Sequence, residues 1–291
     1  MRPRLAGTIS EGSGPINEDG WGFAGTPDDV RAAWVLDGVT GINARSYISG
    51  TTDTHWLVGQ ADHHLRHLAA VGDRSLHDIC AAVVDRLSKE FAALAARSPL
   101  PDDYDPPAAC LLIVKRYRDR WQALRLGDSC LLSDMDDPEG SLFRLVSGPG
   151  LDRELAREAE VHRQKGISET SELLKTFRTR LLASRAKRNT AGGYGIFECS
   201  PTCLDFAEVC ELPSARRILL CTDGFYRAVD HYGLCSDHEL LHRGATEEGL
   251  KGIMADIRRV ERDDADCRRF PRLKPADDAT AVALRVGPPS Q

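Results

Sequence analysis

Short apolar runs that end in Asp-Gly are the most informative feature of the hydrophobic pattern. Residues 33–38 (AWVLDG) and 217–224 (RILLCTDG) are too short for helices and rich in branched side chains. Such runs are typical of buried β-strands. Similar patterns predict further strands at residues 21–24, 108–117, 121–126, 131–133, 141–146, 203–209 and 280–286.

Apolar residues recur at helical spacing in several longer segments. Leu76, Ile79, Val83 and Leu87 follow this spacing and predict a helix over residues 75–97. The same reasoning predicts helices at residues 52–70, 236–243 and 246–262. Strands at both ends of the chain, with helices between them and no dividing linker, predict one interleaved α+β domain spanning residues 1–291.

The segment at about residues 148–190 differs from its surroundings because it is long, strongly charged and helical in pattern. It carries the basic side chains Arg178, Arg180, Arg185, Lys187 and Arg188. One interpretation is a solvated helical face. The other is a flap over an anionic substrate.

Before this charged segment, we expect the strands from residue 108 to residue 146 to form one antiparallel meander.

Composition narrows the classes of function. The 291 residues are 42% hydrophobic and 28% charged, which suits a globular domain, and the net charge of −6 argues against a nucleic-acid partner. No signal peptide or membrane-length apolar run is present. The nine cysteines are odd in number and lie largely in apolar runs, so we expect free thiols in a reducing cytoplasm. We therefore expect a cytoplasmic monomer without a membrane partner.

Candidate chemistry begins with the two aspartates of the Asp-Gly pairs, Asp37 and Asp223. A carboxylate at the edge of a buried strand is costly unless something pairs with it, and two at equivalent places suggest a shared cation. The glycine after each would permit close backbone approach. Alternatively, each Asp-Gly simply marks a hairpin turn. Further acids lie at or near predicted strand ends: Glu18, Asp19, Asp128, Asp277 and Asp278.

A turn signal at residues 26–29 (TPDD) would fold the chain back and bring Glu18 and Asp19 beside Asp37. If one fold gathers all these acids, they could not stay ionised together without cations. Two divalent ions roughly 3.5–4 Å apart, bridged by a carboxylate and a hydroxide, would meet that need. Oxygen ligands favour Mn²⁺ or Mg²⁺ over zinc. The pattern therefore predicts metal-assisted hydrolysis of a phosphoester.

The ordered motifs resemble those of the type 2C protein phosphatases, the metal-dependent PPM family. They are Asn17-Glu18-Asp19, Asp37-Gly38, Gly127-Asp128-Ser129, Thr222-Asp223-Gly224 and Asp277-Asp278-x-Thr280. The resemblance runs from Glu18 to Val286. It implies a four-layer α-β-β-α sandwich, in which two antiparallel sheets pack face to face between antiparallel helices. It also implies Mn²⁺- or Mg²⁺-dependent removal of phosphate from serine or threonine.

The resemblance also gives each acid a role at a metal ion. The implied set is the bridging ligand Asp37 with the Gly38 carbonyl, Glu18 on the second ion, Asp223 and Asp277 on the first, Asp128 at a weaker third ion, and Asp19 orienting a metal-bound water. Asp19 and Asp37 are thus the expected catalytic residues.

Three positions depart from the family pattern. An Arg that often grips phosphate is Gly14 here, a His often found after the first Asp-Gly is Val39, and an acid often found four residues after the later Asp is Arg227. Some bacterial members also lack the Arg and the His. Arg45 or Arg227 could bind the phosphate instead, and a salt-bridge role is the alternative for both.

Other functions remain open beside a phosphoprotein phosphatase. The same two-metal chemistry could act on a small phosphorylated metabolite, because the usual Arg is missing and residues 148–188 are basic. A non-catalytic regulatory module of the same fold is less favoured, since the two-metal set is complete. A haloacid-dehalogenase type needs Asp-x-Asp, whereas this chain has Cys221-Thr222-Asp223.

Overall fold

Two antiparallel sheets pack face to face in the computed structural model, which describes residues 3–70, 72–97, 99–117, 120–135, 141–147, 151–166, 170–212 and 215–287. In spatial order, the five-stranded sheet contains β1 (Pro3–Glu11), β11 (Ala279–Val286), β10 (Arg217–Cys221), β6 (Cys130–Asp134) and β7 (Leu142–Leu145). The six-stranded sheet contains β2 (Gly20–Thr26), β3 (Asp29–Gly38), β4 (Ala108–Tyr117), β5 (Arg120–Leu126) and β9 (Glu208–Leu212), and β8 (Phe197–Glu198) pairs with β4.

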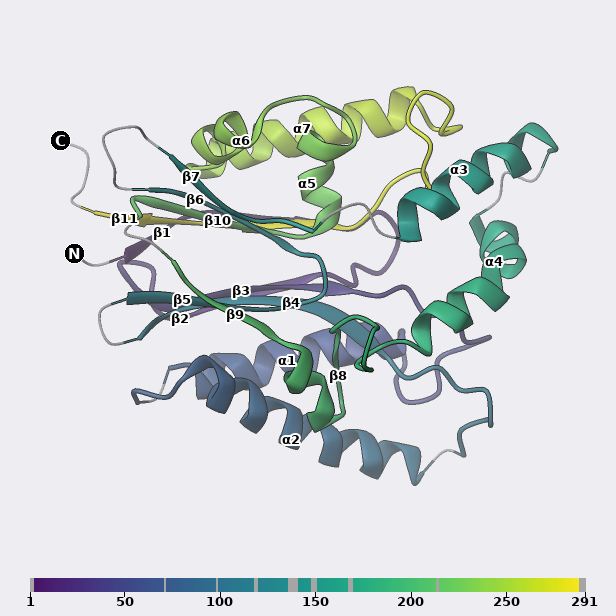
Figure 1. Ribbon diagram of the computed structural model, residues 1–291, viewed down its shortest axis with the longest axis horizontal. Helices are drawn as coiled ribbons and strands as arrows, with labels where there is room; N and C mark the ends of the chain where they lie inside the picture. Colours follow the sequence, from purple (N-terminus) through teal and green to yellow (C-terminus); the bar gives the residue numbers. More distant parts are fainter. Residues whose placement is uncertain are drawn as a thin grey trace.

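Helices cover the outer face of each sheet (Figure 1). The six-stranded sheet is covered by α1 (Asp53–Leu68) and α2 (Leu76–Ala95). The five-stranded sheet is covered by α5 (Asp223–Asp230), α6 (Asp237–Arg243) and α7 (Glu247–Asp263). This arrangement confirms the predicted four-layer sandwich.

The period of two along each strand explains the continuous apolar runs. In β3, Trp34 and Leu36 join the core under α1 and α2, whereas Ala33 and Val35 join the core between the sheets. Successive side chains of a strand point to opposite faces, and here both faces are covered, so every position must be apolar. The same alternation places β10 and β11 between the helical layer and the facing sheet.

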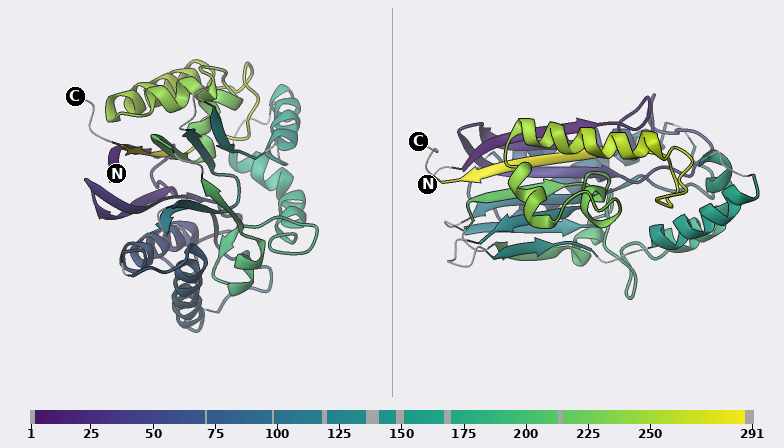
Figure 2. Two further views of the ribbon diagram at one scale, coloured as in Figure 1. Left: turned by 60° about the vertical axis from the view of Figure 1, so that its left-hand side comes forward. Right: turned by 90° about the horizontal axis from the view of Figure 1, so that it is seen from above.

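The strand ends that carry the candidate acids meet at one end of the sandwich. Asp37 at the end of β3 pairs with Cys110 at the start of β4, and Cys221 at the end of β10 pairs with Ala281 near the start of β11. The chain folds back at residues 26–29, as predicted, and this hairpin places residue 20 opposite residue 36. The start of β1 and the end of β11, which pair with each other, lie at the opposite end of the sandwich (Figure 2).

Two connections differ from the expected meander and strand pattern. The strands from residue 108 to residue 146 do not form one meander, because β5 belongs to the six-stranded sheet and β6 to the other. The chain changes sheets at Gly127-Asp128-Ser129. The strand predicted at 203–209 is instead a 3₁₀ helix (Pro201–Phe206) followed by β9, because Pro201 fixes the backbone and cannot donate to a strand ladder.

Strand β1 and helix α5 were not predicted from the sequence. β1 pairs along its length with β11, although its polar residues and Gly7 hide the apolar alternation. α5 begins directly at Asp223, where only a turn was expected.

The charged segment is helical as predicted and forms two helices, α3 (Leu151–Gln164) and α4 (Thr170–Arg185). They lie beyond the end of the sandwich that carries the acids (Figures 1 and 2). No helix within the described ranges combines the length and apolar character that a membrane crossing requires.

Candidate metal centre

Asp37 lies at the centre of the acid cluster. Burial and the nearby negative charges of Asp223, Asp19, Asp128 and Asp277 hold its pKa well above the usual range. One carboxylate oxygen of Asp37, one of Asp128 and the Cys110 sulfur all lie within 4.8 Å of one another. Asp128, from the turn between β5 and β6, thus lies beside Asp37, and Asp19, Asp223 and Asp277 lie near enough for their charges to act on it.

Glycine allows the backbone to close tightly around Asp37 and Asp223. A Cβ on Gly38 would lie 2.5 Å from the Glu18 carbonyl oxygen, and a Cβ on Gly224 would lie 2.0 Å from the Asp278 carbonyl oxygen. Both distances are far inside van der Waals contact. The glycine of each Asp-Gly therefore permits the close approach that the sequence pattern suggested.

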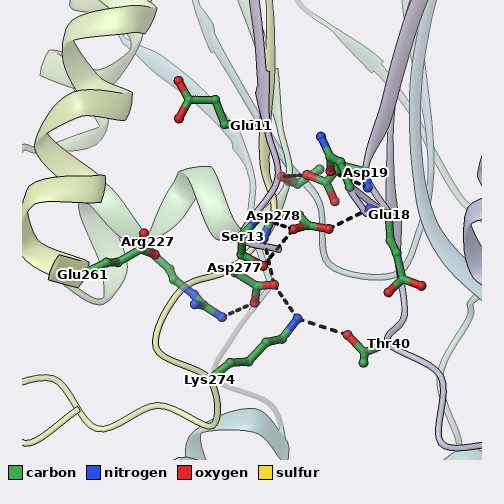
Figure 3. Close-up of polar contacts among 12 residues, drawn as sticks. Glu11, Ser13, Glu18, Asp19, Thr40, Arg227, Glu261, Lys274, Asp277 and Asp278 are labelled. Carbon is green, nitrogen blue, oxygen red and sulfur yellow. Dashed lines mark hydrogen bonds and ion pairs between the residues drawn. The ribbon is translucent and has the colours of Figure 1, made fainter. Parts of the chain in front are cut away.

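Asp277 differs from Asp37 because two cations neutralise it. Lys274 Nζ lies 2.5 Å from one carboxylate oxygen and Arg227 Nη2 lies 2.5 Å from the other (Figure 3). Burial opposes ionisation, but these two cations outweigh it and hold the pKa of Asp277 below its ordinary value. Asp277 is therefore a carboxylate, available as an oxygen ligand.

Glu18 lies in the segment that leads into β2. The hydroxyl of Thr52 donates a 2.5 Å hydrogen bond to Glu18 Oε1 and also caps the first turn of α1 by accepting from the His55 backbone N–H. Burial raises the pKa of Glu18, while the Thr52 bond and the charge of Lys274 act in the opposite direction. Helix α1 thus fixes this side chain at the edge of the cluster.

Asp19 is buried deeper, beside the β10–α5 junction. It accepts a 2.9 Å hydrogen bond from the Thr222 hydroxyl, and Thr222 directly precedes Asp223. Burial raises the pKa of Asp19 well above its usual range, and the charges of Asp277 and Asp278 raise it further. This contact joins the first acidic motif, which contains Asp19, to the fourth, which contains Thr222 and Asp223.

Asp278 and Lys274 had no predicted role, and both contact residues of the acid cluster. Asp278 accepts hydrogen bonds from the backbone N–H and hydroxyl of Ser13, at 2.6 and 2.9 Å, and from the Glu18 backbone N–H at 2.7 Å. It thereby holds the Glu18 segment against the start of β11 (Figure 3). The adjacent Asp277-Asp278 pair was the only available signal, and nothing in the sequence singled out Lys274.

The two arginines proposed for phosphate lie in different surroundings. Arg227 is in α5, and its guanidinium is paired with Asp277, with only 17% of the side chain exposed. Arg45 is exposed, and its guanidinium lies 4.8 Å from the centre of the Tyr47 ring. In the part of the chain that the structure describes, Arg45 forms no ion pair with the clustered acids.

The donor set fits hard divalent cations. Within the described ranges, no lysine or arginine forms an ion pair with Asp37, Asp19 or Glu18, so their ionised forms need another source of positive charge. Nearly all donors are carboxylate oxygens, which suit Mn²⁺ and Mg²⁺. The exception is Cys110, whose burial raises its thiol pKa and whose Sγ donates to Asp128 at 3.1 Å.

Comparison with solved structures places the fold among bacterial phosphatases. The chain superposes on the Mycobacterium tuberculosis serine/threonine phosphatase PstP/Ppp with a TM-score of 0.59 and 15% identity, covering 99% of this chain and 100% of that one. The catalytic domain of PstP in complex with two manganese ions superposes with a TM-score of 0.55 and 17% identity, covering 98% of this chain and 99% of that one. PppA of Pseudomonas aeruginosa superposes with a TM-score of 0.55 and 17% identity, covering 98% of each chain.

No curated protein sequence is significantly similar to this chain. The family model for protein phosphatase 2C matches residues 6–258, which include most of β1, the whole of β2 to β10 and most of the acid cluster. That match covers most of the 291 residues and agrees with the fold of the solved structures. This chain therefore belongs to the protein phosphatase 2C family, whose members are metal-dependent phosphatases.

Proposed function

We propose that this protein removes phosphate from phosphoserine and phosphothreonine in protein substrates, with two Mn²⁺ or Mg²⁺ ions bound by the acid cluster. The observation that carries this proposal is the surroundings of Asp37, on which four acids from distant parts of the chain act. Ionised acids that repel one another this strongly are stable in one site only when cations are bound among them. The serine/threonine phosphatase PstP/Ppp has the same fold, which supports the substrate class.

In this proposal, Asp37 and the Gly38 carbonyl would help to hold both ions. Glu18 would hold one ion, and Asp223 and Asp277 would hold the other. Asp128 would serve a third, weaker ion. When bound, the ions would activate water and neutralise charge on the phosphate.

The chain itself supplies the positioning. The Thr222 hydroxyl donates a 2.9 Å hydrogen bond to the Asp19 carboxylate and so holds it in place. In that position, Asp19 could orient a water molecule by accepting a hydrogen bond from it. Lys274 and Arg227 keep Asp277 ionised at neutral pH. The Thr52 hydroxyl holds Glu18 in one orientation. These contacts preorganise the acids, so little reorganisation is needed when the ions bind.

We also propose that residues 1–291 act as one phosphatase domain in which α3 and α4 form a flap. Their position beyond the acid-bearing end of the sandwich supports this role (Figure 1). We expect a cytoplasmic monomer, and the nine free cysteines are consistent with a reducing compartment. Light scattering coupled to size-exclusion chromatography tests the oligomeric state.

A manganese-dependent assay tests the proposed function. The purified chain is given phosphoserine and phosphothreonine peptides and, in parallel, a panel of small phosphorylated metabolites. We expect peptide hydrolysis that EDTA abolishes and added Mn²⁺ restores. Preference for a metabolite would assign the protein to the small-molecule phosphatases. That class is possible because Gly14 stands where family members often have an Arg that binds phosphate. Manganese binding without hydrolysis of any phosphomonoester would contradict the proposed activity.

A further inference from the structure

A phosphomonoester dianion that approaches a cluster of carboxylates needs positive charge from the protein as well as from metal ions. The Lys274 ammonium is a side-chain cation of this cluster, paired with Asp277. It comes from the loop between α7 and β11 and reaches the loop that follows β3, where it donates to Thr40 Oγ1 at 3.1 Å (Figure 3). Its charge acts on three candidate metal ligands, Glu18, Asp223 and Asp277.

We propose that Lys274 binds a phosphate oxygen of the substrate and sets the affinity of the site for phosphomonoesters. This inference rests on the proposed function. An ammonium has three N–H donors, and in the described part of the chain two of them are used, on Asp277 and Thr40. The third donor is free for a phosphate oxygen, and a charge-assisted bond of this kind is among the stronger hydrogen bonds.

Exposure separates Lys274 from the nearby arginines. Lys274 is 30% exposed, compared with 17% for Arg227 and 14% for Arg258. Arg227 donates to the Asp277 carboxylate, and Arg258 donates to the Asp277 backbone carbonyl and to Glu261. A substrate therefore reaches the ammonium more easily than either guanidinium. Arg45 is exposed as well, but it lies over Tyr47 rather than against an acid of the cluster.

Thr40 fixes the ammonium from the flap side. The Thr40 backbone carbonyl accepts a 2.6 Å hydrogen bond from Arg185 at the end of α4, and its hydroxyl accepts from Lys274. Lys274 is thus held between Asp277 and a residue that is itself attached to α4. A cation held in this way pays little ordering entropy when a phosphate binds.

Calorimetry on the full chain tests the proposal. Binding of inorganic phosphate to the Mn²⁺-loaded protein and binding of Mn²⁺ alone are measured for the wild type, Lys274→Met, Lys274→Arg and Thr40→Val. We expect Lys274→Met to weaken phosphate binding about tenfold or more. Lys274→Arg should keep most of the wild-type affinity for phosphate, and Thr40→Val should weaken phosphate binding less than Lys274→Met does. Mn²⁺ affinity should not fall. Lys251→Met, at an exposed ion pair with Glu247 on α7, is the matched control and should change neither affinity.

Steady-state kinetics on a phosphopeptide provide the second readout. Lys274→Met should raise KM about as much as it weakens phosphate binding, with kcat changed less than about threefold. Unchanged phosphate affinity in a folded Lys274→Met protein would overturn the proposal. Tighter Mn²⁺ binding with unchanged phosphate affinity would also overturn it, because Lys274 would then be only a counter-ion of Asp277. If the wild type hydrolyses nothing, the proposed function fails, and phosphate calorimetry still decides the role of Lys274.

Discussion

At the residue scale, the metal-free protein should become less stable as pH rises. Burial and like charges raise the pKa of Asp37 and Asp19 above the ordinary value of 3.8, so the folded state binds more protons than the unfolded state above about pH 4. The free energy of unfolding therefore falls with rising pH, by up to about 1.4 kcal/mol per pH unit for each proton. Urea denaturation in EDTA across about pH 4 to 8 measures this slope.

The variant Asp37→Asn should flatten that slope, because it removes the most strongly repelled carboxylate. It should also lower hydrolysis at least about a hundredfold, since the bridging ligand is lost while the fold is intact. The control Asp85→Asn changes an exposed carboxylate on α2 that pairs with Lys89 and should leave both properties unchanged. Full activity of Asp37→Asn would contradict its role as a metal ligand.

Gly224→Ala should lower both stability and Mn²⁺ affinity, because its Cβ would lie 2.0 Å from the Asp278 carbonyl oxygen and must displace backbone. We expect a loss of about 1–3 kcal/mol. Gly59→Ala is the matched control: it lies within α1 with no atom near its added Cβ, so it should stabilise the helix by about 0.5–1 kcal/mol. Thermal unfolding compares the two, and equal melting temperatures would refute the close packing at Gly224.

At the element scale, α4 is attached to the loop before β4 by a buried ion pair. Asp105 is paired with both Arg185 and Arg188, and all three side chains are less than 10% exposed. Asp105→Asn would leave two buried guanidinium groups without a carboxylate, at a cost of about 3–5 kcal/mol. We expect faster hydrogen exchange along α4 and a lower melting temperature.

The pair Arg178–Asp103 joins the same helix to the same loop but is exposed, which makes Asp103→Asn a close control. Its loss should cost less than about 1 kcal/mol and leave exchange along α4 unchanged. If the two variants behave alike, burial of the Asp105 ion pair does not hold α4 in place.

Elements with a strong apolar period were predictable from the sequence, and weakly patterned ones were not. Strands β3, β4, β10 and β11 are covered on both faces, so their continuous apolar runs are unambiguous. β1 was missed because its pairing with β11 depends on tertiary contacts rather than on its own composition. The passage of the chain from one sheet to the other after β5 was also not predicted, because the apolar pattern of a strand does not show which sheet it joins.

At the scale of the whole molecule, the acids could be predicted because each carries a local signal, a charge at the end of a buried run. Their convergence followed from a family resemblance spanning the chain, and the fold agrees with it. Lys274 and Asp278 could not be assigned, because their roles depend on contacts with Thr40 and Ser13, more than 230 positions away. A single lysine in a loop gives no periodic or motif signal.

Glu18, Asp37, Asp223 and Asp277 are proposed to bind a pair of divalent ions. Anomalous diffraction from a crystal soaked in Mn²⁺ tests this proposal most directly, because manganese scatters anomalously and the protein's oxygen ligands do not. We predict two strong anomalous peaks among the carboxylates of Glu18, Asp37, Asp223 and Asp277, with Asp37 in contact with both. A manganese-active protein whose crystals show no peak beside Asp37 would contradict the account.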